Sequence, residues 1–169
     1  MKRKINIQLV LIAMLAVIST TIGITIVCYN LFQKQVREDL KTNAKILEET
    51  GLFEDKSRAQ DISLNINYED LRISWIDSDG TVIYDNDTSV TNLENHADRP
   101  EVKEAFEKGI GESVRNSDTM NMNTFYYAIL LENNTVLRVA VEARNMRSVF
   151  ATATPLVFSI LLAIIIICV

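Results

Sequence analysis

Six polar side chains in the middle of the chain have the chemistry to bind a small ligand. They carry one imidazole, three guanidinium groups and two hydroxyl groups, and they are His96, Arg99, Arg115, Ser117, Tyr127 and Arg138. Guanidinium groups bind carboxylates and phosphates through paired, charge-assisted hydrogen bonds. The set therefore predicts a site for a small anionic or polar ligand, with Arg115 and Arg138 as its main contacts.

Arg138 has a second interpretation, in which its partner belongs to the chain itself. It lies between Leu137 and Val139 in a segment that alternates as a strand does, so its side chain points to the face opposite theirs. A buried charge without a partner is costly, and Arg138 therefore requires either a ligand or an internal carboxylate. Three acidic residues are candidates for that internal partner: Glu101, Glu104 and Asp118.

His96, the only histidine, also has two interpretations. An imidazole changes its charge close to physiological pH, which would make this residue a pH switch. We favour instead a hydrogen-bonding role at the approach to a helix that begins near Pro100.

The residues needed for catalysis or metal binding are not present in a recognisable pattern. With one histidine, and with cysteine only at Cys28 and Cys168 in or beside apolar segments, the chain cannot form a Cys-His dyad, a multi-histidine zinc site or a disulfide framework. The sequence also lacks a Gly-x-x-x-x-Gly-Lys phosphate loop and a Gly-x-Ser-x-Gly nucleophile elbow. We expect no catalytic residue, metal or cofactor in this chain.

Four aspartates flank a predicted turn: Asp77, Asp79, Asp85 and Asp87. Their spacing differs from that of an EF-hand loop, and the bidentate glutamate of that loop has no counterpart. We interpret them as acidic turn residues, with a weak divalent-cation site as the alternative.

The elements that must position these residues lie between two uncharged, apolar segments. No charged residue occurs over residues 5–32 or 148–169, and about 20 helical residues cross a bilayer. We expect a cytoplasmic basic N-terminus (1–6), a first transmembrane helix (7–29), an extracytoplasmic domain (30–147) and a second transmembrane helix (148–169). A cleaved signal peptide is the alternative for the first segment.

The basic start Met1–Lys4 predicts a cytoplasmic N-terminus, although Arg144 and Arg147 oppose this orientation. The segment between the apolar ends holds all 22 acidic residues and 14 of the 17 basic ones. Its net charge of −8 disfavours nucleic-acid binding.

A helical stripe follows the first apolar segment. Val36, Leu40, Ala44 and Leu47 recur at helical spacing, and we expect the membrane helix to continue to a stop near Gly51. The stripe packs either on its own domain or on a second copy as a coiled coil. The polar segment Leu52–Asp70 reads as a connector with a short helix.

The rest of the domain is predicted to form strands around one short helix, and the segment 125–131 is apolar on both faces, as a central strand is. We expect strands at 71–75, 81–85, 112–116, 124–131 and 135–143, with Asp79-Gly80 as the first hairpin turn. The helix is predicted to start at an Asp98 cap, with Glu101 completing a capping-box-like spacing, and to end at Gly109. Its predicted buried stripe is Val102, Ala105 and Phe106. The order predicts a small α+β domain with a five-stranded antiparallel sheet.

An ordered series of short motifs resembles a known family. Arg72–Asp85 (RISWIDSDGTVIYD) leads to Asn95–Val102 (NHADRPEV), and then to Gly109-Ile110-Gly111, Arg115-Asn116-Ser117 and Tyr126-Tyr127-Ala128. The series resembles the extracytoplasmic sensor region of membrane-bound two-component histidine kinases of the phosphate-regulon-sensor (PhoR-like) type. The resemblance covers residues 71–147 together with the two flanking apolar segments.

The resemblance implies a PAS-like (Cache-type) sensor fold and a homodimer. It also implies cytoplasmic kinase domains after the second span, which use ATP and Mg²⁺ and reach a response regulator. We expect this chain to be the sensor portion without the kinase part, as a fragment or a truncated frame. The segment 96–100 only imitates the family's phosphoacceptor motif, so His96 is not expected to be phosphorylated.

The sequence therefore predicts a membrane-bound signal receptor that passes an extracytoplasmic stimulus across the bilayer by helix displacement, without naming the stimulus. Its partners would be membrane lipid, a second copy and an unknown small molecule or protein, with no nucleic acid. A chemoreceptor or cyclic-dinucleotide synthase with the same outer module is one alternative. A membrane-anchored module that binds a protein partner through its acidic surface is another.

Overall fold

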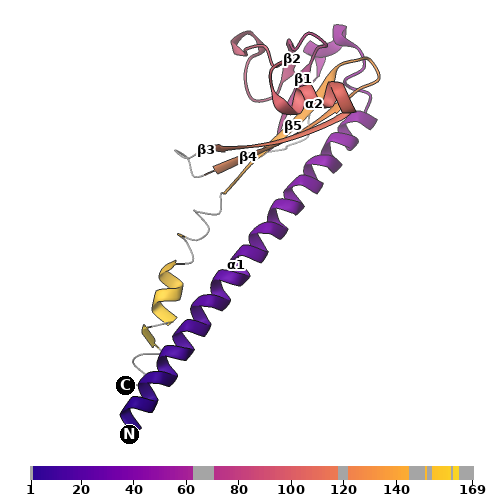
Figure 1. Cartoon of the computed structure of the whole chain (residues 1–169). Helices are drawn as coiled ribbons and strands as arrows, with labels where there is room; N and C mark the ends of the chain where they lie inside the picture. The colour runs from indigo at the N-terminus through magenta and orange to yellow at the C-terminus, as the bar shows by residue number, and fades with distance from the viewer. Residues whose placement is uncertain are drawn as a thin grey trace. The chain divides into compact units, whose positions relative to one another are not determined.

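The computed structural model describes residues 2–62, 71–117, 122–144, 151, 154–160 and 162–163 (Figure 1). By contacts the chain divides into two units, Met1–Lys34 with Arg144–Val169, and Gln35–Ala143. The second unit contains the sheet. The first unit contains the apolar segments.

The first element is one long helix, α1 (Lys2–Glu49). Its apolar half is long and apolar enough to cross a membrane, and side chains there such as Leu11, Ile12 and Leu15 are exposed. The helix ends two residues before Gly51, whose positive φ of 67° provides the predicted stop. The predicted continuation of the first apolar segment into the domain is therefore confirmed. Most of the second predicted span lies outside the described residues, although 154–160 are helical.

The last turns of α1 belong to the core of the domain. Leu40, Ala44 and Leu47 are buried and join one apolar cluster with Trp75 and Phe53. This confirms the predicted stripe and shows that it packs on its own domain. The following connector contains a short 3-10 helix, η1 (Lys56–Asp61), and the remainder of the predicted connector, 63–70, lies outside the described residues.

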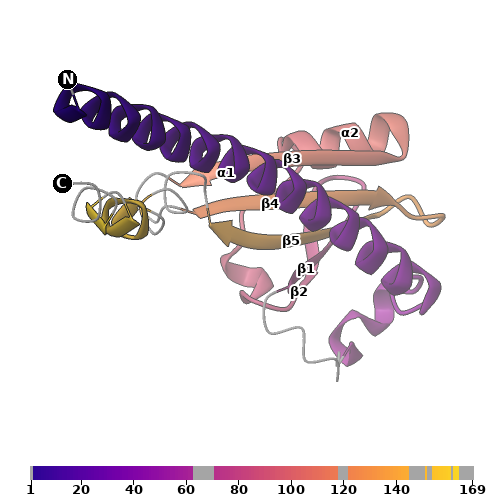
Figure 2. The ribbon, with the colours of Figure 1, turned by 90° about the horizontal axis from the view of Figure 1, so that it is seen from below.

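Five antiparallel strands form one sheet, in the order β2-β1-β5-β4-β3. The strands are β1 (Leu71–Ile76), β2 (Val82–Asp85), β3 (Ile110–Ser117), β4 (Met122–Leu130) and β5 (Val136–Arg144). All five predicted strands are present, and the α+β, PAS-like fold class is confirmed. Figure 2 shows the last turns of α1 crossing one face of this sheet.

The opposite face carries the second helix, α2 (Pro100–Lys108), preceded by a short 3-10 turn, η2 (Val90–Asn92). Val102 and Ala105 are fully buried against the sheet, whereas Phe106 is only partly buried. α2 lies unusually close to β3, because a Cβ added at Gly111 would stand 1.9 Å from the backbone oxygen of Glu101. The helix ends at Gly109 with a φ of 86°, as predicted.

The predicted start of α2 is wrong by one residue. Arg99, not Asp98, occupies the N-cap position and makes no side-chain cap, while Asp98 pairs with Lys103 at 2.9 Å. The capping-box role of Glu101 is also wrong, because its side chain is completely buried and points to the sheet. The physical reason is that guanidinium groups on the sheet form charge-assisted hydrogen bonds with this carboxylate. These bonds are stronger than a bond to a backbone N–H at the exposed end of the helix.

Candidate functional site

The face of the sheet beneath α2 carries a polar cluster beside a small apolar one, whereas the face beneath α1 packs a larger apolar cluster. Ile73, Trp75 and Leu137 enter the α1-side cluster, so their neighbours in β1 and β5 point the other way. Register then brings Ser74 opposite Arg138, and Ser113 opposite Tyr126. The residues on this face come from four strands, and together with Glu101 of α2 they form the candidate site.

Glu101 is the centre of this site. One of its oxygens lies 2.6 Å and the other 2.7 Å from Nη2 of Arg115, and the hydroxyl of Ser113 donates to it at 2.6 Å. Nη1 of Arg138 lies 3.5 Å from the same carboxylate. Burial raises the pKa of Glu101, but the hydrogen bonds from Ser113 and Arg115 outweigh it and hold that pKa below its usual value. Glu101 is therefore ionised at neutral pH.

Arg138 is almost completely buried beside this carboxylate. Its Nη2 donates to the hydroxyl of Ser74 at 2.9 Å, and its Nε has no hydrogen-bond partner in the described part of the chain. Burial lowers the pKa of Arg138 and the charge of Glu101 opposes that change. An arginine stays protonated in either case, so the pair is ionic.

An aromatic ring lies against both guanidinium groups. The ring centroid of Tyr126 is 4.1 Å from Cζ of Arg115 and 5.4 Å from Cζ of Arg138. β4 lies between β3 and β5, so this ring occupies the space between the two cations on the sheet. Cation–π contacts at such distances hold guanidinium groups in place.

The polar network continues from Ser74 to β2. Asp85 accepts hydrogen bonds from the hydroxyl of Ser74 at 2.8 Å and from Nε of Arg72 at 3.1 Å. It also accepts from the backbone N–H groups of Asp87 and Thr88. Burial raises the pKa of Asp85, yet these hydrogen bonds lower it overall. Ionic and hydrogen-bonding contacts thus connect α2 to β2 across the sheet.

His96 lies in the loop before α2 and is buried. Its backbone N–H donates to the carbonyl of Gly80 at 2.8 Å, and its carbonyl accepts from the backbone N–H of Arg99 at 3.0 Å, so its backbone forms the approach to the helix. Burial and then the charges of Arg138 and Arg99 lower its pKa from 6.5 to about 4. Its Nδ1 has no hydrogen-bond partner within the described residues. The imidazole is therefore neutral at physiological pH.

The structure brings together only some of the predicted ligand residues. Arg115 and Arg138 meet at Glu101, one of the three internal partners that the sequence offered. Tyr127, in contrast, lies in the α1-side core, and its neighbour Tyr126 occupies the position beneath α2. The side chain of Ser117 is outside the described residues. Side chains along a strand point alternately to the two faces of the sheet, and this rule applied to β4 could have placed Tyr126 rather than Tyr127 in the site.

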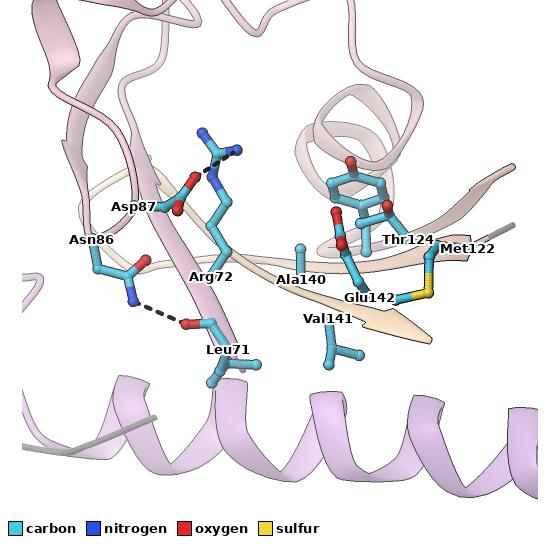
Figure 3. A pocket seen from close by; sticks show the side chains of 10 residues that line it. Leu71, Arg72, Asn86, Asp87, Met122, Thr124, Ala140, Val141 and Glu142 are labelled. Carbon is cyan, nitrogen blue, oxygen red and sulfur yellow. Dashed lines mark hydrogen bonds and ion pairs between the residues drawn. The ribbon is translucent and has the colours of Figure 1, made fainter. Parts of the chain in front are cut away.

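A pocket of about 490 Å³ opens on the same face beyond Tyr126 (Figure 3). Its charged lining residues are Arg72, Asp87 and Glu142. Figure 3 shows Arg72 and Glu142 projecting from one side of the sheet, and Leu71 and Val141 pointing to the side of α1. Arg72 is engaged by Asp85 and Asp87, so the pocket has a cation that is already paired.

The four aspartates near the first hairpin take part in turn and ion-pair contacts. Asp77 pairs with Lys56 at 2.6 Å, and Asp79 accepts from the backbone N–H of Thr81. Asp85 and Asp87 both contact Arg72. Over the described residues, no three His, Cys, Asp or Glu side chains gather as they would around a metal ion.

Comparison with known proteins agrees with this architecture. Residues 30–137 match the family described as Single Cache-like, an extracytoplasmic sensor domain type, and no curated protein matches the chain. The match covers α1 from its exit of the apolar segment, α2 and the first four strands. This chain therefore belongs to the Single Cache-like family.

Proposed function

We propose that this chain is the sensory portion of a two-component sensor histidine kinase. Two transmembrane helices anchor it in the cell membrane, with the Cache domain outside the cytoplasm. A stimulus at the domain displaces the second helix relative to the first. The displacement reaches a cytoplasmic kinase domain, which uses ATP and Mg²⁺ to phosphorylate a histidine and then a response regulator.

The continuity of α1 is the observation that carries this proposal. The helix has no break between its apolar half and the turns that bear Leu40, Ala44 and Leu47. Those three side chains are at most 2% exposed within the core of the domain. Any repacking of the sheet therefore acts directly on the helix, because tightly packed cores change between discrete arrangements rather than deforming smoothly.

The second connection to an apolar segment also starts in the core. β5 lies between β1 and β4 and ends at Arg144, shortly before the uncharged segment 148–169. Both apolar segments thus adjoin elements that contact the polar face or the core of the sheet. A stimulus that favours one packing over another can shift both helices.

The motif series that resembles sensor histidine kinases coincides with a compact structural unit. Nδ2 of Asn95 donates to the backbone oxygen of Asp79 at 2.9 Å, next to the bond between His96 and Gly80. Gly80 has a φ of 86°, and a Cβ there would stand 2.3 Å from Oδ1 of Asn95. The hairpin turn and the approach to α2 therefore depend on each other, which supports comparing them as one motif.

The kinase assignment is tested by autophosphorylation of the full-length gene product in membranes with radiolabelled ATP. We expect an acid-labile phosphohistidine, and we expect its amount to be unchanged by His96→Gln. Membranes that lack the protein are the control. If the membranes incorporate no label, or if His96→Gln abolishes the label in a folded protein, the kinase assignment or the topology is wrong.

The topology is tested separately with an impermeant maleimide. Ser78 is exposed in the first hairpin turn, so Ser78→Cys in a background of Cys28→Ser and Cys168→Ser reports the side on which the domain lies. We expect labelling in intact cells to equal labelling after lysis. Labelling that requires lysis would place the domain in the cytoplasm and refute the proposal.

A further inference from the structure

We propose that Arg115, Arg138 and Ser113 form a carboxylate-binding site that the domain fills with its own Glu101. The natural protein is then self-liganded at this position, and shortening Glu101 opens a site for a free monocarboxylate such as formate or acetate. This inference stands on geometry alone.

All three donors of this site lie on the sheet, on β3 and β5, whereas the carboxylate comes from α2. Arg138 is held by Ser74 at 2.9 Å, and Tyr126 lies against both guanidinium groups. Arg115 and Ser113 stand two residues apart on β3 and point to the same face. Contacts within the sheet therefore help to hold both guanidinium groups in place, which favours the binding of a carboxylate.

The occupant comes from a different element and completes the site as a ligand would. Glu101 is completely buried, and its two oxygens together receive Arg115, Ser113 and Arg138 at 2.6–3.5 Å. This is the arrangement of a carboxylate bound by guanidinium groups and a hydroxyl. The side chain enters from α2, which covers the donors.

The charge around the site favours an anion. Two guanidinium groups face one carboxylate, and the next acidic group, Asp85, is engaged by Arg72 and Ser74. In the loop before α2, His96 is neutral, because burial and the positive charges of Arg138 and Arg99 lower its pKa. Two buried nitrogens, Nε of Arg138 and Nδ1 of His96, still lack partners in the described part of the chain. The pocket of a removed carboxylate would therefore remain attractive to a negative ion.

Covalent attachment explains why the site is closed in the natural protein. α2 is fixed by the buried Val102 and Ala105 and by its close approach to Gly111, so Glu101 has little freedom to leave. A tethered group of this kind has an effective concentration in the millimolar range or above. Free acetate at millimolar concentration should therefore not displace Glu101, and α2 should stay docked on the sheet.

The experiment is chemical rescue of Glu101→Ala in the full chain, purified in detergent. Unfolding is followed by fluorescence of Trp75, the only tryptophan, which is buried in the core. With a dissociation constant of about 10 mM, 100 mM acetate would raise the folding constant about tenfold, which corresponds to roughly 7 °C in Tm. We expect Tm to rise by this amount in acetate relative to sodium chloride at equal ionic strength. The rise should saturate as the acetate concentration increases.

Three matched variants separate the site from general salt effects. The natural chain and Glu104→Ala, which shortens an exposed acid of the same helix, should show no acetate-specific shift. Glu101→Gln should show none either, because its side chain fills the space. Glu101→Ala combined with Arg115→Met should lose the rescue, because the main donor is gone.

The proposal is overturned if acetate and chloride act equally on Glu101→Ala, or if acetate stabilises all variants alike. If Glu101→Ala does not fold unaided, recovery from urea is compared in acetate and in chloride. Refolding that depends on acetate supports the site, and equal failure in both salts overturns it. None of these measurements needs a kinase, so failure here and failure of the receptor proposal are distinguishable.

Discussion

The buried carboxylate of Glu101 predicts a large loss of stability when its charge alone is removed. Glu101→Gln keeps the size of the side chain and one acceptor oxygen, but it leaves Arg115 and Arg138 without a counter-charge. Breaking one side of a buried ion pair costs about 3–5 kcal/mol. Because Ser113 can still donate to the amide oxygen, we take the lower end, about 3 kcal/mol.

For a domain of this size such a loss lowers Tm by about 15 °C. The assay is urea and thermal unfolding of the full chain in detergent, followed by Trp75 fluorescence. Glu104→Gln is the matched control: it makes the same change on the same helix, but its pair with Lys108 is exposed, so its effect should be far smaller. Equal effects of the two variants would refute the conclusion that the buried pair holds α2 on the sheet.

The same variant predicts a change in acid stability. The pKa of Glu101 lies below its usual value in the folded state. A carboxyl of this kind contributes stability above its unfolded pKa and loses it as pH falls through the folded pKa. Glu101→Gln should therefore unfold with a weaker pH dependence below about pH 4.5 than the natural chain. If the stability of Glu101→Gln and of the natural chain fell equally as the pH is lowered, the conclusion that Glu101 is ionised in the folded state would be contradicted.

Three further substitutions test other parts of the structure. The pKa of His96 is lowered to about 4, so the folded state binds fewer protons than the unfolded state between pH 6.5 and 4. The free energy of unfolding therefore falls by up to about 1.4 kcal/mol per pH unit as the pH drops through this range. In urea titrations, His96→Gln should remove this pH dependence. Gly111→Ala places a Cβ against the backbone of Glu101 and should cost about 2 kcal/mol or more by the same assay. Leu47→Ala empties part of the core beneath α1 and should cost about 2–5 kcal/mol, whereas the exposed neighbour Ile46→Ala should cost far less.

Each of these expectations can fail in a specific way. If the unfolding free energy of His96→Gln still fell between pH 6.5 and 4, the group that titrates would be one other than His96. A stable Gly111→Ala would mean that α2 does not rest on β3. Equal losses for Leu47→Ala and Ile46→Ala would mean that α1 is not part of the core of the domain.

Local features of the fold were readable from the sequence because they depend on neighbours along the chain. The stripe Leu40, Ala44 and Leu47 follows helical spacing, and it is the buried stripe of α1. Gly80 lies in the hairpin turn between β1 and β2, and Gly109 ends α2; both stand where a positive φ angle is needed. Local patterns located all five strands, and the two uncharged segments stand out by hydropathy alone.

The partners within the site were decided only by the tertiary structure. Arg138 had three candidate carboxylates in the sequence, and the strand order and register bring it to Glu101, 37 residues away. The same register placed Tyr126 rather than Tyr127 beneath α2. A one-residue difference reverses the face of a strand side chain, so such choices depend on how distant strands pair. The N-cap of α2 at Arg99, and the ion pair that buries Glu101 on the sheet, were likewise visible only in the tertiary structure, because they depend on contacts between elements distant in the chain.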